Sequence, residues 1–173
     1  ASFHESEADD WVVHLIDTGL ATNTGGRLKR LQPWLEDGTF MLTYGDGVCN
    51  VDLKALLAFH GKHGLAGTLT AIRPPARFGA LHFDGDLVTE FMEKPQIGEG
   101  WVNGGFMCFE PAIFDHIRGD EDSLEADALE RLAADRQLAA FKHGDFWQCM
   151  DTQRERDILE KLWRDGNPPW GTK

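Results

Sequence analysis

Short apolar runs separated by turn residues fill the first half of the chain and predict strands that alternate with helices. Two such runs, residues 12–16 and 40–44, each end in a loop that contains glycine. The stretch 25–31 reads as a helix. In 53–63 the apolar side chains recur at i, i+3 and i+4, so they share one helix face. We therefore expect strand, helix, strand and helix in this order.

The later half adds a hairpin and further strands and helices. Asp84 and Gly85 lie between two strand-like runs, which is a strong hairpin signal. Further strands are expected at 68–72, 104–109, 138–141 and 146–150, and further helices at 112–117, 123–136 and 153–164. This order predicts an α/β fold, a three-layer Rossmann-like domain with a mixed sheet. No linker interrupts the sequence, so we expect residues 1–173 to form a single domain.

Composition narrows the possible partners. The 173 residues carry 17 Lys and Arg against 29 Asp and Glu, a formal charge of −12 that argues against nucleic acid. No apolar stretch approaches the ~20 residues that cross a bilayer, so no membrane partner is expected. The three cysteines form no C-x-x-C pair and resemble reduced thiols, which predicts a cytoplasmic protein. His60 and His63 have helical spacing but lack a zinc pattern, which favours a structural pair.

Two aspartates stand where α/β sheets place their ligands. Asp46 lies between two glycines directly after the run 40–44, and Asp151 follows the run 146–150. Two carboxylates from such strand ends could chelate one Mg²⁺ beside a bound phosphate. Both residues also fit plainer roles, Asp46 as part of a turn and Asp151 as the N-cap of the last helix.

Three further segments could contact a ligand. Glu93 and Lys94 end a strand before Pro95, which presents the lysine to a phosphate and the glutamate to sugar hydroxyls. Asn103 and the two glycines after it would let a ligand ring lie against the backbone. The hydroxyl- and glycine-rich entry 22–27 could bind an anion through helix amides. The ordinary alternatives are a solvated strand end, a bulge and a capping loop.

Taken in order, these segments resemble the sugar-1-phosphate nucleotidyltransferases, and most closely their glucose-1-phosphate cytidylyltransferase branch. The resemblance covers nearly the whole chain. It is carried by 17–30 (D-T-G to T-G-G-R-L-K-R), 40–48 (F-M-L-T-Y-G-D-G-V), 93–95 (E-K-P), 101–106 (W-V-N-G-G-F) and 146–152 (F-W-Q-C-M-D-T). It implies a Mg²⁺-dependent enzyme of polysaccharide biosynthesis. Such an enzyme binds a nucleoside triphosphate and a sugar 1-phosphate, and transfers CMP from CTP to glucose 1-phosphate to give CDP-glucose and pyrophosphate.

The resemblance also implies roles for individual residues. The implied metal ligands are Asp46 and Asp151, which together with Lys94 form the implied catalytic set. The implied nucleotide-binding positions are Thr22, Arg27 and Gly45. The implied sugar-phosphate-binding positions are Gly79, Glu93, Lys94, Asn103 and Gly104.

One departure from the family pattern limits what this chain is expected to do. The family opens with a strand, a glycine-rich G-G-x-G-T-R loop and a P-K-P-M segment, none of which occurs in this sequence. We therefore expect the central and C-terminal part of the domain, with an uncovered sheet edge that favours a homo-oligomer. Whether the chain alone is active stays open. So do two alternatives, a relative that uses UTP or dTTP and a truncated, non-catalytic module that binds sugar phosphate.

Overall fold

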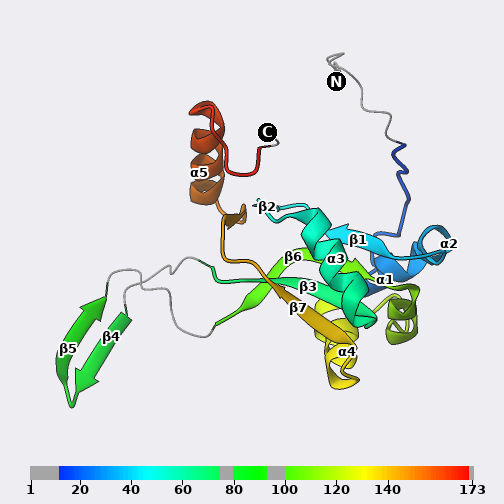
Figure 1. Ribbon diagram of the computed structural model, residues 1–173, viewed down its shortest axis with the longest axis horizontal. Helices are drawn as coiled ribbons and strands as arrows, with labels where there is room; N and C mark the ends of the chain where they lie inside the picture. The colour runs from blue at the N-terminus through cyan, green and yellow to red at the C-terminus, as the bar shows by residue number, and fades with distance from the viewer. Residues whose placement is uncertain (1–11, 75–79, 93–99, 172–173) are drawn as a thin grey trace.

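The chain folds as a mixture of helices and strands (Figure 1). The computed structural model describes residues 12–74, 80–92 and 100–171. The expected α/β class is confirmed in these stretches. No helix within them has both the length and the apolar character that crossing a membrane requires.

Four strands form the central sheet. Their order is β1 (Phe40–Thr43), β6 (Val102–Phe109), β3 (Gly67–Ile72) and β7 (Leu138–Lys142). β6 runs antiparallel to both of its neighbours, whereas β3 and β7 are parallel, so the sheet is mixed as the sequence predicts. Among the described strands β1 pairs with β6 alone, which leaves its other edge without a described partner.

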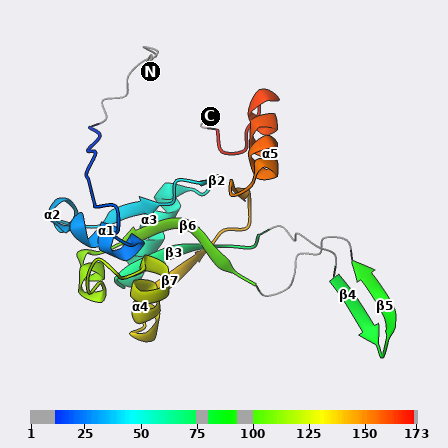
Figure 2. The same cartoon turned by 180° about the vertical axis from the view of Figure 1, so that it is seen from behind.

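The main core lies on one face of this sheet beneath short helices. These are α1 (Thr24–Arg30), η1 (Pro111–His116), η2 (Leu124–Leu129) and α4 (Glu130–Ala134). They lie behind the sheet in Figure 1 and in front of it in Figure 2. Buried apolar side chains from strands and helices pack together there, among them Met107, Phe109, Phe114, Leu124 and Leu132. Each such side chain stabilises the fold by about 2 kcal/mol through burial.

The opposite face of the sheet is covered by α3 (Leu53–His63), so the arrangement has three layers (Figure 1). The carboxylate of Asp52 accepts hydrogen bonds from the second and third amides of this helix and caps it. Gly64 ends the helix at φ 66°, in the left-handed region that favours glycine. Leu56 and His60 are buried against the sheet. The sequence predicted this helix with the same bounds, 53–63.

Two small antiparallel sheets accompany the central one. β4 (Ala80–Asp84) and β5 (Leu87–Met92) form the predicted hairpin, with Gly85 at φ 55° in its turn. β2 (Gly47–Cys49) and β8 (Trp147–Cys149) come from opposite halves of the chain and pair as a short ribbon. α5 (Gln153–Arg164) follows this ribbon and has the predicted bounds.

One sequence-based expectation was wrong. Residues 12–16 are not a strand, because no described strand offers this segment the backbone partners that a strand needs. The helix expected at 123–136 is present, but its first part, η2, is π-helical and only the short α4 that follows is α-helical. The amide of Ala128 reaches back five residues to the carbonyl of Ser123, at 3.2 Å. This wider turn keeps both Ala128 and Leu129 in the core.

Candidate functional site

The β2–β8 ribbon brings the two candidate aspartates side by side. Gly47 lies opposite Cys149 in the ribbon. Just beyond this pair, the amide of Met150 donates to the carbonyl of Asp46 at 2.7 Å. Asp151 is therefore next in sequence to a residue bonded to Asp46, and both aspartate side chains are exposed. Gly45 is also exposed and has open space at its Cβ position, so a ligand could approach the backbone there.

The last helix does not use Asp151 as its cap, so that alternative is wrong. Thr152 caps α5 instead, in a reciprocal box with Glu155. Oε2 of Glu155 also accepts the amide of Asp151 at 3.0 Å. The side chains of Cys149, Asp151 and Glu155 place one ligand atom each within 4.8 Å of one another. Burial raises the pKa of the Cys149 thiol, and a hydrogen bond with Asp151 raises it further.

A tyrosine hydroxyl connects the segment before Asp46 to Asn103. Tyr44 directly follows β1, and its hydroxyl donates to Oε1 of Glu125 at 2.8 Å. The hydroxyl oxygen of Tyr44 accepts from Nδ2 of Asn103 at 3.1 Å, and Oδ1 of Asn103 accepts from the amide of Gly105 at 2.9 Å. Burial holds the pKa of Tyr44 well above its usual range, and the bond to Glu125 reinforces this shift. The amide of Asn103 is thus held at both ends.

Gly104 is fixed by packing on one side and by an indole on the other. A Cβ at this position would lie 2.9 Å from Cγ2 of Ile72 and 3.1 Å from the carbonyl of Thr70. The carbonyl of Gly104 accepts from Nε1 of Trp147 at 2.7 Å. Trp147 belongs to β8, so this bond ties the Asn103 segment to the aspartate ribbon.

The residues at the start of α1 are held in place mainly by contacts with other residues of the protein. Thr22 is buried, with 7% of its surface exposed. The guanidinium of Arg27 is exposed and donates to Oγ1 of Thr18 at 2.8 Å. The two glycines of this segment let it approach residues 120–123, because a Cβ on Gly26 would lie 2.5 Å from Cα of Asp120. Close backbone packing therefore accounts for these glycines without a ligand.

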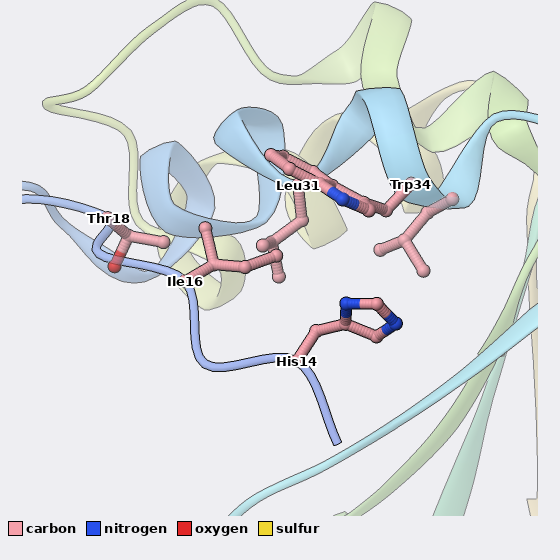
Figure 3. A pocket seen from close by; sticks show the side chains of 6 residues that line it. His14, Ile16, Thr18, Leu31 and Trp34 are labelled. Carbon is pink, nitrogen blue, oxygen red and sulfur yellow. The ribbon is translucent and has the colours of Figure 1, made fainter. Parts of the chain in front are cut away.

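A separate apolar pocket of about 400 Å³ lies between α2 (Gln32–Leu35) and the segment before α1. Figure 3 shows His14 and Ile16 on one wall, with Leu31 and Trp34 on the other. None of the expected site residues lines this pocket. Its chemistry is that of a small hydrophobic surface, so the polar candidate site lies elsewhere.

Part of the expected site lies outside the described residues, namely Gly79, Glu93 and Lys94. Conversely, sequence reasoning missed Tyr44 and Glu125 as a connected pair. No signal in the sequence could have found Glu125, because a glutamate two residues after Ser123 looks like an ordinary helix start. Tyr44 stood inside a recognised motif, but its hydroxyl partner comes from η2 in the other half of the chain.

Comparisons with known proteins place the whole of this region within one family of sequences. The chain is 45% identical to the glucose-1-phosphate cytidylyltransferase of Salmonella typhi over 98% of its own length. It is 33% identical over 80% of its length to the mannose-1-phosphate guanylyltransferase catalytic subunit beta of Dictyostelium discoideum, and covers 40% of that protein. A solved structure from Bacillus anthracis, provisionally assigned as a glucose-1-phosphate thymidylyltransferase, superposes with a TM-score of 0.64 at 15% identity. The match covers 88% of this chain and 64% of that one, and it indicates the fold alone.

The chain spans 66% of the length of its Salmonella typhi relative. The family model described as nucleotidyl transferase matches residues 19–166, which is far more than half of the sequence. That range includes the aspartate ribbon, the Asn103 segment and the entry to α1. The chain therefore belongs to the nucleotidyl transferase family.

Proposed function

We propose that this chain carries the metal-binding and sugar-phosphate-binding part of a glucose-1-phosphate cytidylyltransferase. The observation that carries the proposal is the β2–β8 ribbon, where Asp46 and Asp151 emerge as neighbouring, exposed aspartates. The cap of α5 does not require the Asp151 carboxylate, because Thr152 caps that helix. The 45% identity to the Salmonella typhi cytidylyltransferase supports the choice of nucleotide and sugar.

Asp46 and Asp151 would hold a Mg²⁺ ion. Mg²⁺ prefers carboxylate and water oxygens and keeps several waters, so two exposed aspartates fit it. The thiol of Cys149 does not, because Mg²⁺ binds hard oxygen ligands. When bound, the ion would neutralise phosphate charge and align the two reacting groups.

The other residues would bind and orient the two substrates. Thr22, Arg27 and Gly45 would contact CTP, with the exposed guanidinium of Arg27 supplying positive charge near an anion. Asn103 and Gly104 would contact glucose 1-phosphate, together with Gly79, Glu93 and Lys94. A phosphate oxygen of glucose 1-phosphate would then attack the α-phosphorus of CTP in line, and the bond to pyrophosphate would break. Such a transfer depends mainly on positioning and charge neutralisation.

A second candidate is a sugar-1-phosphate nucleotidyltransferase with another base or sugar. The observation that favours it is the 33% identity to the Dictyostelium discoideum mannose-1-phosphate guanylyltransferase subunit. Both candidates use the same ribbon and the same reaction, so they differ only in the substrates that an assay would identify.

The test is an assay of pyrophosphate release with Mg²⁺ and paired substrates. CTP, UTP, dTTP and GTP are each combined with glucose 1-phosphate or mannose 1-phosphate. The chain is assayed alone and joined to those parts of the Salmonella typhi relative that lie outside the match. We expect turnover with CTP and glucose 1-phosphate in at least the joined form. Turnover with another pair would favour the second candidate, and absence of turnover in both forms would overturn the enzyme proposal.

A further inference from the structure

Two segments of the proposed site, those that contain Tyr44 and Thr24, meet at one carboxylate. Oε1 of Glu125 accepts from the hydroxyl of Tyr44 at 2.8 Å. Oε2 accepts from the hydroxyls of Thr24 and Ser123 at 2.9 Å and 3.0 Å. Thr24 opens α1, which carries the proposed nucleotide contact Arg27. Glu125 therefore joins the nucleotide side of the site to the strand end that leads to the proposed metal ligand.

Two hydrogen bonds connect Glu125 to Asn103 through the hydroxyl of Tyr44. Their donors and acceptors follow from the single proton that this hydroxyl carries. An ionised carboxylate only accepts, so the single proton of the Tyr44 hydroxyl must go to Glu125. The hydroxyl oxygen is then left as an acceptor, and Nδ2 of Asn103 donates to it. Since Oδ1 of Asn103 accepts from Gly105, the amide is held in one of its two possible orientations.

Glu125 is suited to remain ionised in this place. It is half-buried, and burial alone would raise its pKa. The hydrogen bonds from the hydroxyls of Tyr44, Thr24 and Ser123, with one from a backbone amide, outweigh burial and lower the pKa below the usual value. Hydrogen bonds to a charged acceptor are stronger than neutral ones, so this anchor is firm.

The ring of Tyr44 is located as tightly as its hydroxyl. It lies against Gly105, where a Cβ would come within 2.5 Å of the ring carbon Cδ2. Gly105 has φ 80°, a conformation that glycine adopts at little cost. The backbone amide of Tyr44 also donates to the carbonyl of Gly105 at 3.0 Å. The strand that carries Asn103 and the residue that orients it are thus held in register.

We propose that Glu125 and Tyr44 form a positioning pair that orients the Asn103 amide toward the sugar phosphate and holds it in register with α1. This inference rests on the proposed function. Neither residue of the pair needs to touch the reacting atoms. Among the described residues, Asn103 retains one N–H and part of the accepting capacity of Oδ1, and these are the groups left for a sugar hydroxyl.

The experiment compares ligand affinity with stability in the full chain. Tyr44→Phe removes only the hydroxyl, and Glu130→Gln changes an exposed neighbour outside the network. Glu125→Gln removes the charge and replaces one of the two accepting oxygens by an NH₂ donor. Calorimetry measures the dissociation constants of glucose 1-phosphate and of Mg²⁺ with CTP, and urea unfolding measures stability. We expect Tyr44→Phe to weaken glucose 1-phosphate about tenfold and CTP less than twofold. Glu125→Gln should act in the same direction but less, because its amide oxygen still accepts, and Glu130→Gln should change neither constant.

Two outcomes contradict the proposal in distinguishable ways. If Tyr44→Phe lowers stability but leaves the affinity for glucose 1-phosphate unchanged, the pair only supports the fold and the positioning role is overturned. If neither the unmodified chain nor the form joined to the remaining parts of the Salmonella typhi relative binds glucose 1-phosphate, the proposed function fails and the positioning role with it. The sequence has a single tyrosine, so one ¹³Cζ resonance reports Tyr44 alone. Glucose 1-phosphate should shift this resonance in the unmodified chain and shift it less in Glu125→Gln.

Discussion

The polar side chains beneath α3 and the side chain of Asp46 at the end of the β2–β8 ribbon differ in where their partners lie. Beneath α3, His60 and His63 both bond the hydroxyl of Thr68, and His60 also contacts Glu110. On the ribbon the side chain of Asp46 is exposed and has no hydrogen-bond partner among the described residues. Folding explains the first group, because buried polar atoms must be satisfied within the protein. It does not explain the second, which is why the ribbon is the candidate site.

The buried group can be followed proton by proton. The amide of Leu65 donates to Nδ1 of His63 at 3.0 Å, so a neutral His63 carries its proton on Nε2 and donates to Thr68. The hydroxyl of Thr68 then donates to Nδ1 of His60, at 2.7 Å. His60 carries its own proton on Nε2 and donates to Oε1 of Glu110, at 3.1 Å. Each bond in this chain has one donor and one acceptor, so no outside partner is needed.

The largest effect should come from Asp46, and it should fall on binding alone. Asp46→Asn keeps the size of the side chain but removes the charge that would hold Mg²⁺. We expect the affinity for Mg²⁺ with CTP to fall on the order of 100-fold, as for lost metal-site partners. The free energy of unfolding should change by less than about 0.5 kcal/mol, as for an exposed residue. Calorimetry measures the affinity and urea unfolding measures the stability. A large loss of stability with unchanged binding would show that Asp46 serves the fold and not ligand binding.

The opposite behaviour is expected beneath α3. Thr68→Val removes the buried hydroxyl that bonds ring nitrogens of both His60 and His63, so we expect a loss of about 2–3 kcal/mol in urea unfolding. Thr70→Val is the matched control, two residues along the same strand. The hydroxyl of Thr70 is buried without a partner among the described residues, so its removal should be neutral or stabilising by up to about 1 kcal/mol. Equal losses for both variants would show that the histidine bonds contribute nothing.

Local patterns predicted the parts of the fold whose stabilising groups are close in sequence. α3 has its cap at Asp52 and its end at Gly64, and α5 has its apolar face and its first-turn glutamate. Residues 12–16 look equally strand-like, but a strand depends on neighbours that no local pattern can supply. The π-helical turn η2 was not predictable for a similar reason, because it results from packing two successive side chains into the core.

The candidate site divides in the same way. Asp46 and Asp151 were predictable as a pair because each directly follows an apolar run that reads as a strand. The tie between Tyr44 and Glu125 was not, because it joins distant segments through a hydroxyl whose partner only the folded chain identifies. The cap of α5 was only partly predictable from the sequence. Asp151 and Thr152 are both good N-caps, and the box with Glu155 decides for Thr152.

The N-cap of α5 can be tested by its effect on stability, which should be smaller than that of Thr68→Val. The result shows whether Thr152 or Asp151 caps the helix. Thr152→Ala removes the hydroxyl that accepts the amide of Glu155, so we expect a loss of about 1 kcal/mol in urea unfolding. Arg154→Ala, at an exposed position of the same helix, should change stability by less than about 0.5 kcal/mol. If Asp151 were the true cap, Asp151→Ala would show the loss and Thr152→Ala would not.

The smallest effect should be a pH dependence of the free energy of unfolding that His63 causes. Burial lowers the pKa of His63, and the neighbouring His60 lowers it further. Near and below pH 6.5 the unfolded chain therefore binds more protons at this residue than the folded chain does. This contribution to stability is fully present above that pH and is lost as the pH falls toward the lowered pKa. Urea unfolding between pH 5 and 8 measures it, and the stability of His63→Gln should depend less on pH than that of the unmodified chain. His116→Gln, at a histidine outside this group, serves as the control. Protonation of Nδ1 of His63 would also deprive the amide of Leu65 of its acceptor. Equal pH dependence in His63→Gln and the unmodified chain would therefore show that His63 does not cause the pH dependence of stability.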